Sequence, residues 1–89
     1  MRYFTTTQVL PEDVLSRARD FMSANSSLTV REEDPASVTF AGAIGVARFS
    51  VDRHGGQTNV HLETDRVAGL DVTDVARRFL YSLREANRG

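Results

Sequence analysis

Two histidines and a set of carboxylates are the residues whose types could support proton transfer or metal binding in this sequence. His61 and Glu63 are separated by one residue, so in a strand they lie on the same face. A carboxylate beside an imidazole can move a proton or ligate a metal ion. A third ligand would have to come from Asp52 or Asn59, which are predicted to lie nearer a turn. We therefore favour a solvated sheet face, and we expect no catalytic residue, no metal ligand and no cofactor.

Residue types missing from the chain exclude several kinds of chemistry. There is no cysteine, which excludes disulfides, thiolate nucleophiles and iron–sulfur ligation. All 11 basic residues are arginine, so a Schiff-base lysine and a P-loop lysine are excluded as well. The remaining chemistry therefore depends on His54, His61, the 12 carboxylates and the hydroxyl side chains.

Length and composition predict one globular domain spanning residues 1–89. The chain is 40% hydrophobic and 26% charged, with a formal net charge of −1. No apolar run approaches the roughly 20 residues that a membrane span needs. The opening MRYFTTTQ lacks the basic-then-apolar pattern of a signal peptide. We expect a cytoplasmic protein without a membrane partner.

Hydrophobic periodicity predicts two helices. Apolar residues recur at helical spacing over residues 11–25, which begin with Pro11 and an acidic first turn, and again over residues 71–87. Residues 2–10 are rich in β-branched and aromatic types and are predicted to form the first strand. The threonines of this strand do not show which of its faces is buried, so Tyr3 and Phe4 stay unassigned.

Turn signals divide the middle of the chain into four further strands. They fall at Asp34-Pro35, at residues 42–45 and at Gly55-Gly56. The element order is β-α-β-β-β-β-α. It predicts an α+β fold of two layers, a five-stranded antiparallel sheet with both helices on one face. An exposed edge at the second strand would be ready for pairing with another chain.

The pair Gly55-Gly56 predicts a tight hairpin, because a two-residue type I′ turn needs positive φ at both positions. His54 before it could suggest a glycine-rich phosphate loop, but such loops lead into a helix, and here a strand follows.

The hairpin sets a register in which one face is apolar and the other polar. The apolar pairs are Val51 with Val60 and Phe49 with Leu62, and the polar pairs are Asp52 with Asn59, Ser50 with His61 and Arg48 with Glu63. Arg31 and Thr39 are expected to share the polar face, and Arg48 with Glu63 would form an ordinary cross-strand ion pair of under ~1 kcal/mol.

The order of elements is similar to that of the helix-grip and START-like proteins, the polyketide-cyclase and lipid-transport superfamily. The opening TTQVLPEDVLSRARDF resembles the start of those domains, a strand followed by a proline-started helix with an acidic first turn. The helix over residues 71–87 resembles their gripping helix. Those domains have more strands, and the count here is closer to the β-α-β4-α unit of TATA-binding-protein-like folds. The resemblance implies a ligand site between sheet and last helix, and no family motif carries a functional residue onto this chain.

Apolar residues where the sheet and the last helix meet are the candidate ligand-binding site. They are Phe40, Phe49, Leu62, Val75, Phe79 and Leu83. The alternative is that they form the whole core, because a void costs a small domain stability.

The last helix also carries basic residues interleaved with an aromatic residue, a pattern that can bind nucleic-acid phosphates. They are Arg77, Tyr81, Arg84 and Arg88. Asp74 and Glu85 share the exposed surface and the net charge is negative, so an ion-paired, solvated helix face is favoured and nucleic acid is not an expected partner.

These observations favour a small non-enzymatic binding or interaction domain, for an apolar ligand or for a protein partner such as a second copy of the chain. One alternative is a small cyclase- or hydrolase-like enzyme, which needs His61 or Glu63 to point into a cavity. The other is nucleic-acid binding through the arginine-bearing last helix.

Overall fold

The computed structural model describes residues 2–66 and 72–86, and the side chains of these except residues 66 and 84–86. The elements within these residues are β1 (Arg2–Thr7), α1 (Pro11–Asn25), β2 (Thr29–Asp34), β3 (Ser37–Gly42), β4 (Gly45–His54), β5 (Gln57–Arg66) and α2 (Val72–Ala86). The expected α+β class and the order β-α-β-β-β-β-α are confirmed.

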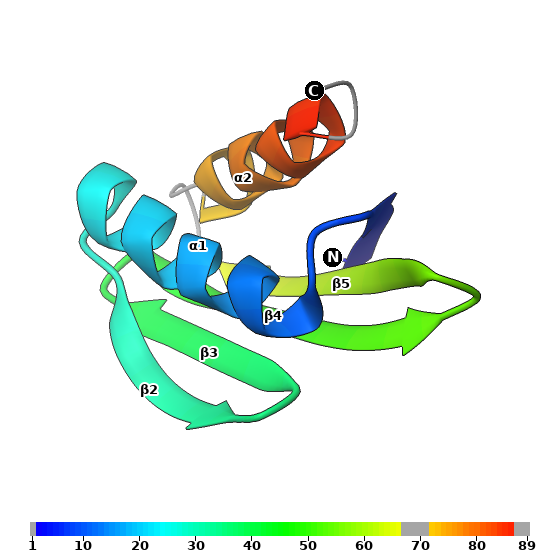
Figure 1. Ribbon diagram of the computed structural model, residues 1–89. Helices are drawn as coiled ribbons and strands as arrows, with labels where there is room; N and C mark the ends of the chain where they lie inside the picture. Colours follow the sequence, from blue (N-terminus) through cyan, green and yellow to red (C-terminus); the bar gives the residue numbers. More distant parts are fainter. Residues whose placement is uncertain (1, 67–71, 87–89) are drawn as a thin grey trace.

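The strands form one antiparallel sheet in the order β1-β5-β4-β3-β2. Both helices lie over the same face of this sheet (Figure 1), α1 contacting β4 and α2 contacting β1, β5 and β4. The last strand, β5, therefore lies between β4 and the first strand, β1. Among the described residues, β1 and β2 are the two edges of the sheet.

The β4–β5 hairpin has the predicted register. Val51 pairs with Val60 and Phe49 with Leu62, and all four side chains are buried. The turn glycines have φ values of 62° at Gly55 and 81° at Gly56, in the left-handed region that glycine adopts without a steric cost.

The first strand ends at Thr7, three residues before the predicted end. The Thr7 hydroxyl accepts a hydrogen bond from the Val9 N–H at 3.2 Å, which turns the chain toward the start of α1 at Pro11. Pairing with β5 settles the two faces of this strand. Tyr3 pairs with Leu62 and lies on the helix side, whereas Phe4 pairs with His61 on the outer face.

The second strand is an exposed edge that carries a bulge. Its register to β3 shifts between Val30 and Glu32, and all six of its residues are exposed. At its end the Ala36 N–H donates to the Asp34 carboxylate at 2.8 Å, and the Ser37 hydroxyl donates to the other oxygen at 2.9 Å. The hydrogen bond from Ala36, followed by that from Ser37, holds the pKa of Asp34 below its ordinary value.

The core is built around a row of phenylalanine rings. Phe49 on β4 makes edge-to-face contacts with Phe40 on β3, at a centroid distance of 6.0 Å, and with Phe79 on α2, at 5.3 Å. Phe21 on α1 lies 5.6 Å from Phe79. The row joins the sheet to both helices.

Two threonine hydrogen bonds place α2 on the sheet. Near its start the Thr64 and Thr73 hydroxyls are 3.0 Å apart, buried between β5 and α2. Toward its end the Thr7 hydroxyl of β1 donates to the Leu83 carbonyl oxygen at 3.4 Å. Because a buried hydroxyl without a partner costs free energy, these bonds favour one placement of the helix.

We expect Phe49→Ala to lower the free energy of unfolding by about 3–5 kcal/mol, because it removes a fully buried ring that two other rings contact. Urea denaturation followed by circular dichroism would measure this. Since that loss could unfold so small a domain, Phe49→Leu serves as the milder variant, with a smaller loss expected. Phe4→Ala, at a 57% exposed residue, is the control and should change stability by less than about 1 kcal/mol. Equal losses for Phe4→Ala and Phe49→Ala would contradict this description of the core.

We expect Gly56→Ala to destabilise the hairpin by about 1 kcal/mol through backbone strain alone. A Cβ at Gly55 or Gly56 meets no atom within 4 Å, so crowding adds nothing. Gly55→Asn is the matched control, because asparagine is preferred at the first position of a type I′ turn, and it should cost less than Gly55→Ala. Thermal unfolding of wild type and the three variants would measure this. The melting temperature of Gly55→Asn should lie above that of Gly55→Ala, and the reverse order would contradict the type I′ turn.

Candidate functional site

The six residues predicted to line an apolar pocket lie together in the hydrophobic core. All are buried, three from the sheet and three from α2. They are Phe40, Phe49, Leu62, Val75, Phe79 and Leu83. None of them lines either of two surface hollows, one between β1 and α2 and one on the outer face of the sheet, and a ligand site among them stays a prediction.

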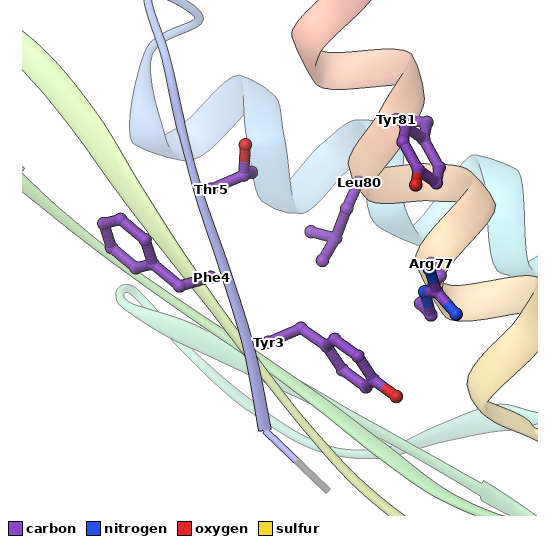
Figure 2. A pocket seen from close by; sticks show the side chains of 6 residues that line it. All are labelled: Tyr3, Phe4, Thr5, Arg77, Leu80 and Tyr81. Carbon is purple, nitrogen blue, oxygen red and sulfur yellow. The ribbon is translucent and has the colours of Figure 1, made fainter.

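A hollow of about 150 Å³ lies between edge strand β1 and helix α2, and we call it the β1–α2 groove. Its lining residues are Tyr3, Phe4, Thr5, Arg77, Leu80 and Tyr81. Figure 2 shows that Tyr3 points from β1 toward α2 and that Leu80 points from α2 into the space between them. Phe4 points to the other side of β1, as strand alternation requires. A cavity of this size holds about one benzene ring.

The sequence places the two walls of this groove at fixed spacings. On α2, residues 77 and 81 are four apart, so they lie one above the other on one helix face. Leu80 beside them turns toward the core and is buried, whereas Tyr81 is 54% exposed. The groove therefore has an apolar floor and an aromatic rim.

Arg77 supplies the positive charge of the groove. Its guanidinium lies 5.4 Å from the centroid of the Tyr3 ring, a cation–π contact. Among the described residues no carboxylate forms an ion pair with Arg77. Asp74, three residues before it, lies 3.9 Å from Arg78. Within the part of the chain whose side chains the structure describes, no aspartate or glutamate lines the groove. The arrangement suits a negatively charged group that carries an apolar part.

The outer face of the sheet is polar, as the register predicted. His61 Nε2 lies 3.7 Å from an Asp52 carboxylate oxygen, and the Asn59 amide donates to the other Asp52 oxygen at 2.7 Å. The exposed Phe4 ring lies 5.0 Å from the His61 ring. The described residues hold no cluster of three side chains that could ligate a metal ion.

The predicted ion pair between Arg48 and Glu63 is not formed, although the two residues face each other in the register. Both line a second, shallow hollow of about 280 Å³ on this outer face. The bulge in β2 places Arg31 and Glu32 in the wall of the same hollow, so charges of both signs surround it. Its described lining holds two arginines and three carboxylates, so charges of opposite sign lie side by side and the hollow offers no site of a single charge.

Two residues of the groove were already noted in the sequence, as part of a possible nucleic-acid-binding pattern. Arg77 and Tyr81 were grouped as a nucleic-acid pattern with Arg84 and Arg88, and the structure brings the first two together with Tyr3. The side chain of Arg84 and all of Arg88 lie outside the described residues. Tyr3 and Thr5 were missed because the face of β1 was unassigned, and the adjacent aromatics Tyr3 and Phe4 were the signal available. Leu80 belongs to the apolar stripe of the last helix and was not singled out for a site.

No helix in the described part of the chain is long and apolar enough to cross a membrane.

We expect Arg77→Ala and Tyr81→Ala each to lower the free energy of unfolding by less than about 1 kcal/mol. Arg77 and Tyr81 are exposed, and an exposed cation–π contact contributes about 0.5–1 kcal/mol. Thermal and urea denaturation would measure both variants beside Leu80→Ala, whose buried side chain should cost about 2 kcal/mol or more. A large loss in Tyr81→Ala would show that the rim of the groove is part of the core.

The fold is similar to that in the solution structure of the Aha1 dimer from Colwellia psychrerythraea, with a TM-score of 0.68 over 98% of this chain and 94% of the other. The two sequences are 14% identical, so the likeness concerns the fold alone. No protein-family model matches the sequence, and no curated protein matches it. At the level of topology the likeness supports a helix-grip-like arrangement of five antiparallel strands and two helices, without assigning a family.

Proposed function

We propose that this protein is a non-enzymatic interaction domain whose binding site is the β1–α2 groove. The observation that carries the proposal is a ring-sized hollow at a sheet edge, with aromatic walls and a guanidinium that no described carboxylate neutralises. Small-molecule sites are usually hollows of about 300–1,000 Å³. A hollow of half that size or less suits one anchoring side chain of a protein partner better than a whole ligand.

An enzymatic function has less support. Catalysis needs a nucleophile, acid or base that converges with its partners around a cavity. His61 and Glu63 lie on the exposed outer face, and His61 has one carboxylate near it at 3.7 Å. An open strand face of this kind does not exclude water or orient a substrate.

A homodimer is the second candidate function. The similar solved structure is a dimer, and β1 of this chain is a sheet edge without an acidic residue along it. Two such edges could pair about a twofold axis. Native mass spectrometry distinguishes the candidates before any partner is added, since the homodimer appears at twice the mass of the chain.

The test of the proposal is selection of peptides from a random phage-displayed library on the purified protein. The selected peptides, made synthetically, should shift backbone amide resonances of β1 and α2 in ¹H–¹⁵N spectra. Tyr81→Ala should weaken their binding by about tenfold, because it removes one wall of the groove.

Val30→Ala is the matched control, an exposed apolar side chain on the opposite sheet edge, and it should leave affinity unchanged. Peptides whose resonance shifts map to the outer face, or that bind Tyr81→Ala as well as wild type, would exclude the β1–α2 groove as the binding site.

A further inference from the structure

The β1–α2 groove lies along a strand edge as well as beneath a helix, and this sets the shape of what it can hold. β1 is the last strand on its side of the sheet among the described residues. In Figure 2 the groove opens beside β1, between that strand and α2. A chain in extended conformation that pairs with β1 would direct alternate side chains toward the helix layer. One of those side chains would enter the groove.

The two sheet edges differ in their readiness to accept another strand. β2 carries a bulge and three consecutive acidic residues, Glu32, Glu33 and Asp34, all exposed. Bulges and edge charges are the common devices that prevent edge-to-edge pairing. β1 has the sequence RYFTTT, a regular register to β5 and no acidic residue. Threonine and aromatic residues also favour extended pairing.

The charge of the groove selects among extended partners. Among the residues whose side chains the structure describes, the charged residues of β1 and of the groove lining are Arg2 and Arg77. A second copy docked edge to edge would bring another Arg2 and Arg77 to this edge, which favours an acidic segment over a second copy. An acidic segment places a negative charge near Arg77.

We propose that the groove binds an extended acidic peptide segment, which adds to β1 as a sixth strand and places one aromatic side chain in the hollow. The inference rests on the proposed function and names its partner. Main-chain hydrogen bonds to β1 supply sequence-independent affinity, the ring-sized hollow selects an aromatic residue, and Arg77 selects a carboxylate near it on the same peptide face.

The probe is a blocked seven-residue peptide with phenylalanine at its centre, glutamate two residues to either side and threonine elsewhere. Glutamate and phenylalanine then share one face of the strand, and the symmetric pattern serves either strand direction. One comparison peptide has glutamine for both glutamates, and another has alanine for phenylalanine. Binding is measured by ¹H–¹⁵N titration of the wild-type protein.

We expect the glutamine peptide to bind about threefold more weakly than the glutamate peptide, the effect of one exposed ion pair. The alanine peptide should bind at least about tenfold more weakly, because the ring leaves the hollow. In Arg77→Gln the preference for glutamate should disappear. It should persist in Arg17→Gln, which loses the same charge at an exposed site on α1. Higher salt should weaken binding of the glutamate peptide alone.

Strand addition has its own readout, slower hydrogen exchange of at least one β1 amide when the probe is bound. Equal affinity for the glutamate and glutamine peptides, or unchanged β1 exchange under saturation, overturns the inference. If library peptides still map to the groove in that case, the proposed function stands and only its partner is wrong. If neither the probe nor library peptides bind there, both fail, and a native mass at twice that of the chain would then favour the homodimer, the second candidate function.

Discussion

The packing of Phe49 between Phe40 and Phe79 is the interaction on which the rest of the molecule depends. It joins β3 and β4 to α2, and through Phe21 it reaches α1 as well. A chain of 89 residues has material for one modest core, and these rings fill its centre. In such a domain we expect binding sites at the edges of the core, where the packing of the helices against the sheet ends.

The β1–α2 groove lies at one of those edges. α2 contacts β1, β5 and β4, so it reaches the edge of the sheet, and hydroxyl contacts near both ends favour this placement. On β5, which α2 also contacts, Val60 and Leu62 are fully buried. At the edge, Tyr3 and Thr5 are half-buried, and no sixth strand among the described residues completes the layer. The groove follows from a helix that reaches a sheet edge lined by small or amphipathic side chains.

The sequence predicted those parts of the fold in which apolar and polar residues separate cleanly. On β4 and β5 alternate residues have opposite character, and a slip of one position would bury Arg48 or Glu63, so the register was determined. On β1 threonine suits either face, and only pairing with β5 shows that Tyr3 faces α2. The bulge after Val30 has no sequence signal comparable to the Gly55-Gly56 turn. The groove could not be predicted for the same reason. Its prediction requires both the orientation of the faces of β1 and the position of α2 over the sheet.

The two sheet edges differ in their protection against pairing with another strand, and this difference supports a binding role for the groove. An edge strand without a bulge or acidic residues is a hazard in a free protein, because it pairs with other chains. β2 has both safeguards, whereas β1 has arginine at one end and Arg77 above it. Positive charge repels a second copy of the same edge but attracts an acidic strand. On the proposed function, these two side chains favour an acidic strand over a second copy of the same edge, so the charge of β1 and α2 and the shape of the groove select the same partner.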